Sequence, residues 1–85
     1  MKEIKILLVD DEEYFVKSLS KYINKMKKLR ADIVLNGKEA LELVENEAPD
    51  VIVLDLKMPG IDGMEVLRRV KKAYPDVQVI MLTGH

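Results

Sequence analysis

Residues 50–60 read DVIVLDLKMPG, an acid, four aliphatic residues, a second acid and then a turn-forming segment. An unbroken apolar run of this length is typical of a strand buried on both faces, as in a parallel sheet. The segment Lys-Met-Pro-Gly has the composition of a turn. Asp55 is therefore predicted to stand where a central strand ends and a loop begins.

Outward from this stretch, strands and helices alternate along the whole chain. Residues 4–9, 31–35 and 77–82 are the other predicted strands. Asn36 with Glu39, and Asp62 with Glu65, have the spacing of helix-capping pairs. Apolar residues at helical spacing predict the buried faces of three helices, made of Phe15, Leu19, Tyr22, Ile23 and Met26, of Ala40, Leu41 and Val44, and of Met64, Leu67 and Val70.

This βαβαβαβ order predicts an α/β fold with a parallel sheet and right-handed crossovers. Ligands of such sheets bind beyond the carboxyl ends of the strands. Asp10 and Asp11 follow the first strand, Asp55 the third and Thr83 the fourth. The polar residues thus gather at the edge where a site is expected.

The composition excludes several classes of protein. The chain has 85 residues, no cysteine and a net charge of −1, with 48% hydrophobic and 34% charged residues. Thiolate metal sites and disulfides are therefore absent, and direct nucleic-acid binding by this segment is not expected. No apolar run is long enough to span a membrane, and the composition is compatible with the cytoplasm. A cluster of basic residues is interpreted as a solvated helix face; it comprises Lys21, Lys25, Lys27, Lys28 and Arg30.

Carboxylates at neighbouring strand ends repel one another unless a cation neutralises them. Oxygen ligands without cysteine indicate a hard ion, Mg²⁺ or Mn²⁺. The alternative is that Asp10 or Asp11 caps the first helix, which would leave Asp55 unexplained. A carboxylate beside such an ion can attack phosphorus and form an acyl phosphate, with the Thr83 hydroxyl donating to a phosphoryl oxygen.

Three motifs carry a resemblance to a known family. Residues 7–12 (LLVDDE), 55–63 (DLKMPGIDG) and 81–85 (MLTGH) resemble the receiver domains of two-component response regulators. The resemblance covers the whole chain. It implies a flavodoxin-like fold with strand order 2-1-3-4, an order taken from the family and not from the residues.

The resemblance implies a role for each matching residue. Asp55 would accept a phosphoryl group from a sensor histidine kinase or a phosphotransfer protein, and the chain would act as a switch and not as an enzyme. Thr83 would contact the phosphoryl group and move on phosphorylation. Mg²⁺ would be held by Asp10, Asp11, Asp55 and the backbone carbonyl of Lys57, while Pro59 and Gly60 would shape the loop. The Lys57 side chain is expected either to donate to the phosphate or to be solvated.

The chain also departs from the family. Residues 1–85 are expected to be the N-terminal portion of a receiver domain, truncated after the fourth strand. The fifth strand, its lysine, the aromatic switch residue and the last helices would be missing. The fourth strand would then be an apolar edge, through which a homodimer or strand exchange could form.

Two other hypotheses about function remain open. A receiver-like interaction module that is not phosphorylated, or a fragment that assembles with another chain, would keep the same motifs. Enzymes on similar sheets fit poorly. A haloacid-dehalogenase-type phosphatase needs an acid where Lys57 stands, and no phosphate-binding glycine-rich loop follows the first strand.

Overall fold

The computed structural model describes residues 2–82. Its elements follow the predicted order: β1 (Ile4–Val9), α1 (Glu13–Asn24), β2 (Leu29–Val34), α2 (Gly37–Asn46), β3 (Val51–Asp55), α3 (Gly63–Ala73) and β4 (Gln78–Leu82). The four strands form one parallel sheet in the order β2-β1-β3-β4. The predicted fold class and strand order are confirmed.

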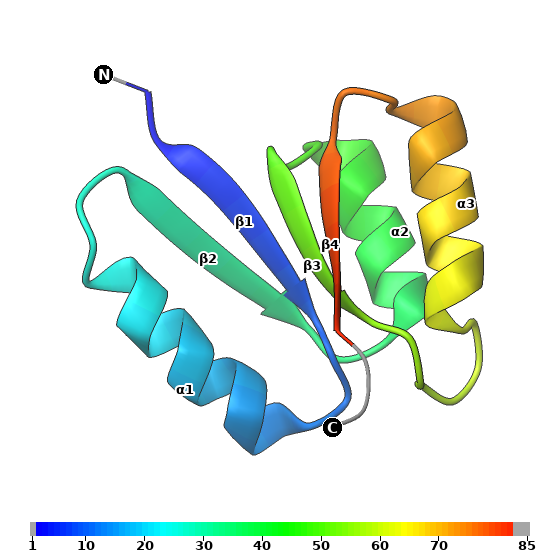
Figure 1. The fold of residues 1–85 in the computed structure, drawn as a ribbon, viewed down its shortest axis with the longest axis horizontal. Coiled ribbons are helices and arrows are strands. Elements are labelled where there is room, and N and C mark those ends of the chain that lie inside the picture. Colours follow the sequence, from blue (N-terminus) through cyan, green and yellow to red (C-terminus); the bar gives the residue numbers. More distant parts are fainter. Residues whose placement is uncertain (1, 83–85) are drawn as a thin grey trace.

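Helices cover both faces of the sheet (Figure 1). On one face, α2 and α3 pack over a cluster that includes Leu7, Ile52, Leu54 and Val70, all at most 1% exposed. On the other face, α1 packs over a smaller cluster of Leu8, Val16 and Ala31. Helices on both faces explain why β1 and β3 are mostly apolar, with Lys5 as the exception in β1 and Asp55 at the end of β3.

Both predicted capping pairs are confirmed. The Asn36 side chain accepts a hydrogen bond from the backbone N–H of Glu39 at 2.9 Å. The Asp62 side chain accepts one from the N–H of Glu65, also at 2.9 Å. These bonds satisfy donors that the first turn of a helix leaves without a partner inside the helix, so they fix where α2 and α3 begin.

The predicted helix faces were only partly right. In α1 the buried residue is Val16, whereas Tyr22 is 63% exposed; Met26, 40% exposed, lies beyond the end of the helix at Asn24. In α3 the buried side chains are Val66 and Val70, whereas Met64 is 53% exposed. The prediction assigned the larger apolar residues to the buried helix faces, whereas smaller valines lie nearer the sheet.

Among the described residues, none of the helices is both long enough and apolar enough to cross a bilayer.

The α1 side of the sheet is incompletely covered over β4. The backbone register places Ile80 beside Val53 on this side, and Ile80 is 53% exposed. β4 pairs only with β3 among the described strands, so it has an open edge. An apolar open edge favours pairing with another chain.

We therefore expect a protein of residues 1–85 to self-associate through β4, and Ile80→Lys to shift it toward the monomer. Light scattering coupled to size exclusion at several concentrations measures this. Met64→Lys is the matched control, because Met64 is equally exposed but lies on α3. An unchanged mass for Ile80→Lys, or an equal effect of both variants, would contradict the expectation.

Candidate functional site

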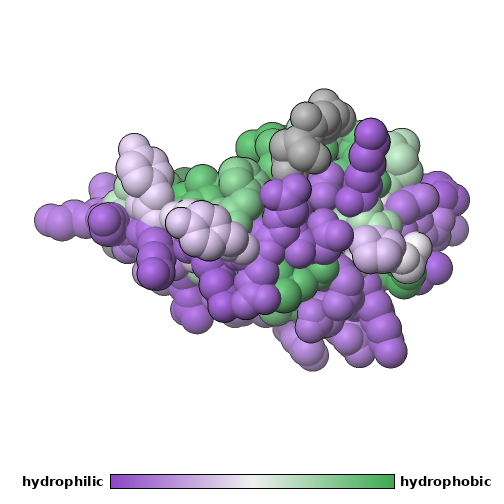
Figure 2. Space-filling model, turned by 90° about the horizontal axis from the view of Figure 1, so that it is seen from below, coloured by the Kyte–Doolittle hydropathy of each residue, from purple (hydrophilic) through white to green (hydrophobic). Residues whose placement is uncertain are grey.

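The register of β1 and β3 brings two acids together. Val9 of β1 pairs with Leu54 of β3, and each is followed directly by an aspartate. Asp10 and Asp55 therefore emerge side by side at the carboxyl end of the sheet. The strand arrows in Figure 1 point toward this end, in the lower part of the picture. Figure 2 views the molecule from this end and shows a largely hydrophilic surface.

Asp11 completes the cluster. Asp10, Asp11 and Asp55 each place a carboxylate oxygen so that the three oxygens lie within 4.8 Å of one another. Asp10 is 1% and Asp55 5% exposed, whereas Asp11 is exposed. The structure thus brings the three predicted acids together, with two of them buried and one open to solvent.

Backbone groups hold the two buried acids in place. The N–H of Asp10 donates to the carbonyl of Val34 at 3.2 Å, which ties it to the end of β2. Its Oδ1 accepts from the N–H of Glu12 at 2.9 Å. The N–H of Lys57 donates to Oδ1 of Asp55 at 3.1 Å. Each carboxylate therefore has a defined orientation before any ligand binds.

The capping alternative for the first helix does not match the structure. Helix α1 begins at Glu13, with Glu12 in the cap position and no side-chain cap hydrogen bond. Asp10 instead bonds to the residue before the helix, and Asp11 lies in the metal-type cluster. Capping of α1 therefore does not account for these acids.

Residues 56–62 connect Asp55 to α3 and lie beside the cluster. Met58 is buried at 7% exposure in the core under α2 and α3, although it belongs to a loop. Pro59 and Gly60 are exposed, and Gly60 has a φ of +80°, which favours glycine. The predicted roles of Pro59, Gly60 and the Lys57 carbonyl remain predictions, as does that of Thr83, which lies outside the described residues.

The donor set fits a hard divalent cation. All three side chains offer carboxylate oxygens, which Mg²⁺ prefers, and Asp11 leaves one side of the cluster open to water. Two buried carboxylates at this separation would repel each other strongly without a nearby positive charge. The residues therefore suit an ion that keeps several of its own waters.

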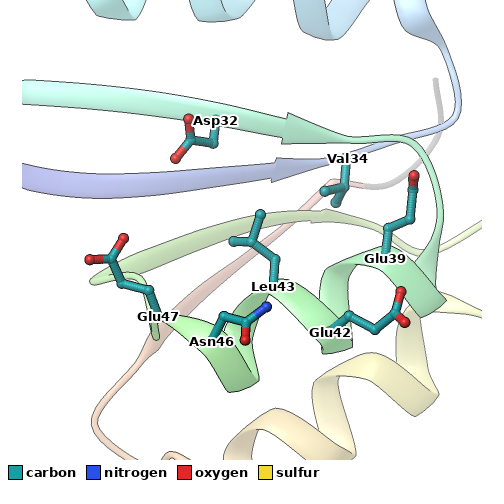
Figure 3. Close-up of a pocket in the computed structure, with 7 residues that line it drawn as sticks. All are labelled: Asp32, Val34, Glu39, Glu42, Leu43, Asn46 and Glu47. Atoms are coloured by element: carbon teal, nitrogen blue, oxygen red, sulfur yellow. The ribbon is translucent and has the colours of Figure 1, made fainter.

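A second acidic region of the surface does not form a comparable set of metal ligands. A groove of about 450 Å³ lies between β2 and α2, with Asp32, Glu39, Glu42 and Glu47 among its lining residues. In Figure 3 their carboxylates point in different directions around Val34 and Leu43. In the described part of the chain, only Asp10, Asp11 and Asp55 bring three potential metal ligands together.

Sequence reasoning missed the residues that support the loop. Met58 was read only as part of a turn, and Ile61 was assigned no role, yet both pack into the core cluster under α2 and α3. Apolar residues inside a segment otherwise typical of a turn were the signal that could have identified them.

Comparison with known proteins agrees with this geometry. The chain matches the family described as response regulator receiver domain over residues 6–85. It is 36% identical over 85 residues to sporulation initiation phosphotransferase F of Bacillus subtilis, covering 100% of this chain and 68% of that relative. It is 40% identical to a protein-glutamate methylesterase/protein-glutamine glutaminase of Treponema denticola, covering 99% of this chain but only 23% of that protein.

Solved structures agree as well. The N-terminal domain of a response regulator receiver protein from Methanoculleus marisnigri superposes with a TM-score of 0.85 at 31% identity, over 95% of this chain and 67% of that one. The chain thus spans about two thirds of the Bacillus subtilis relative and of the Methanoculleus marisnigri domain, and about a quarter or less of the methylesterases. On its sequence, its fold and its carboxylate cluster together, this chain belongs to the response regulator receiver domain family.

Proposed function

We propose that Asp55 is the phosphoryl acceptor of this receiver domain and that Asp10 and Asp11 form the platform for a divalent cation. The observation that supports this most strongly is the pairing of two buried carboxylates with a third, exposed one within 4.8 Å. A relative of similar sequence, sporulation initiation phosphotransferase F, is named as a phosphotransferase, which also supports the proposal.

The backbone orients Asp55 for attack. Because the Lys57 N–H donates to Oδ1 of Asp55, we assign the other carboxylate oxygen, Oδ2, as the nucleophile. A new P–O bond forms between Oδ2 and the phosphorus as the P–N bond of a phosphohistidine breaks. The bonding electrons leave with the imidazole, and Asp55 becomes an acyl phosphate.

We assign Asp10, Asp11, Asp55 and the Lys57 carbonyl as ligands of Mg²⁺, with Mn²⁺ as a substitute. When bound, this ion supplies positive charge that offsets the charge on the transferring phosphoryl oxygens. Asp10 and Asp55 are held by backbone N–H groups, so they are ready to bind without rearrangement. Asp11 is exposed, so its side of the cluster would remain open to water and to the incoming phosphoryl group.

The remaining predicted roles belong to the same proposal. Thr83 would donate its hydroxyl to a phosphoryl oxygen, and the Lys57 side chain, which is exposed, is free to reach the phosphate or remain in water. Pro59 and Gly60 would hold the loop in the shape that presents the Lys57 carbonyl. Residues 1–85 would be the N-terminal portion of the receiver domain.

The phosphoryl donor would be a sensor histidine kinase or a phosphotransfer protein in the cytoplasm. Tyr14 is 87% exposed and stands three residues after Asp11, at the start of α1. A large exposed aromatic side chain next to a reactive site is a typical contact for a protein partner. We propose that this end of α1 receives the donor protein, and that the chain itself performs no further catalysis.

For the metal platform, we expect Mg²⁺ to raise the melting temperature of the protein. A concentration of 100 times Kd would add about 2.7 kcal/mol to the free energy of unfolding. Asp10→Asn should remove most of this effect, yet stabilise the metal-free protein because one of two buried like charges disappears. Asp62→Asn is the matched control, since Asn also caps α3 and Asp62 lies outside the cluster. Equal Mg²⁺ responses in both variants would refute the assignment.

For the acceptor, incubation with acetyl phosphate and Mg²⁺ should add one phosphoryl group that peptide mass spectrometry maps to Asp55. Asp55→Asn should abolish the modification, because an amide oxygen is a far weaker nucleophile. A parent protein that binds Mg²⁺ but gains no phosphoryl group would instead support an interaction module that is not phosphorylated.

For the donor contact, Tyr14→Ala should slow phosphoryl transfer from a protein donor by about tenfold, the effect of losing roughly 1.4 kcal/mol of binding energy. It should leave phosphorylation by acetyl phosphate unchanged, since a small donor needs no protein contact. Tyr22→Ala serves as control, because Tyr22 is also exposed on α1 but two turns further on. Equal slowing by both variants would contradict a contact at the start of α1.

A further inference from the structure

The start of helix α2 touches the loop that carries the acceptor site. Gly37 is the first residue of α2 and is buried. A β-carbon built on Gly37 would lie 2.6 Å from the carbonyl oxygen of Ile61 and 2.9 Å from Cγ2 of Val66. Contacts below 3.0 Å are essentially never tolerated by a real side chain, and the nearest atom here is backbone. Gly37 is therefore a place where α2 and the loop pack backbone against backbone.

The loop is also held at both of its ends. Its beginning is held by the Lys57 N–H on Asp55 and by buried Met58. Its end is held where the N–H of Gly63 donates to the carbonyl of Leu56 at 3.4 Å. Ile61 lies between these anchors and is only partly buried. Its contact with Gly37 limits how far this part of the loop can move toward α2.

We propose that Gly37 is a positioning residue for the acceptor site: its missing side chain sets the place of the loop at Ile61, and through the loop that of the Lys57 backbone beside Asp55. This inference rests on the proposed function, because it explains how a residue of α2 would control metal binding and phosphorylation. A substitution at Gly37 would push the loop away from α2 and weaken the site without touching any of its acids.

Helix propensity alone leads to the opposite expectation. Alanine is favoured over glycine in a helix by about 1 kcal/mol, so Gly37→Ala should stabilise α2 if space were available. Steric overlap with Ile61 and Val66 should instead displace the loop. Residues that support metal ligands from outside the coordination shell commonly change metal affinity by about 10–100-fold. We therefore expect Gly37→Ala to weaken Mg²⁺ binding by about tenfold or more.

The test compares Gly37→Ala with Val44→Ala, which removes buried volume from α2 away from the loop. Two-dimensional amide NMR without metal should show shifts at residues 57–61 in Gly37→Ala but not in Val44→Ala. Mg²⁺ titration of folded protein should show the loss of affinity only in Gly37→Ala. Unshifted loop resonances, or equal Mg²⁺ affinities in the two variants, would overturn the proposal.

A double variant separates the two overlaps. Adding Val66→Ala to Gly37→Ala removes the contact with the Val66 side chain but leaves that with the Ile61 backbone. The loop shifts and the weak Mg²⁺ binding should persist in the double variant, because the overlap with Ile61 remains; their recovery would overturn the proposal. If the single variant does not fold, the same two measurements on the double variant decide. If the parent protein binds no Mg²⁺, the proposed function fails, while the metal-free loop shifts still test the role of Gly37.

Discussion

The parallel register between β1 and β3 is the constraint on which the site depends. Val9 and Leu54 are backbone partners, so the residues that follow them leave the sheet side by side. Those residues are Asp10 and Asp55, both almost fully buried. A shift of one residue in this register would turn the apolar residues of either strand to the opposite face, which is why core packing and site geometry are specified together.

Burying two carboxylates at one edge is unfavourable for the fold by itself, because like charges in a poorly solvated place raise each other's free energy. The backbone N–H groups of Glu12 and Lys57 donate hydrogen bonds to these carboxylates and so offset part of the cost. The arrangement of the three carboxylates also favours binding of a cation. The loop that supplies the Lys57 donor is in turn anchored by Met58 and limited by Gly37. Core packing and the contact at the start of α2 thus act on the same few atoms around Asp55.

The sequence predicted the order of elements and the three clustered acids because both follow from strong local signals. Runs such as VIVL predict buried strands, and acids directly after such runs fall at the carboxyl edge of a parallel sheet. Helix faces were harder, because the sheet covers only a narrow stripe of each helix. Val16 lies on that stripe while the larger Tyr22 does not. The role proposed for Gly37 could not be predicted from the sequence, because it depends on a contact with Ile61 that forms only in the folded chain.

The central claim is that Asp10, Asp11 and Asp55 bind one divalent cation beside the acceptor oxygen. Anomalous scattering from a crystal of the protein grown with Mn²⁺ tests it most directly. The account predicts one strong peak within coordination distance of Asp11 and Asp55, with Asp10 contacting it directly or through water. A peak confined to the acids between β2 and α2, or none at a Mn²⁺ concentration that stabilises the protein in solution, would contradict it.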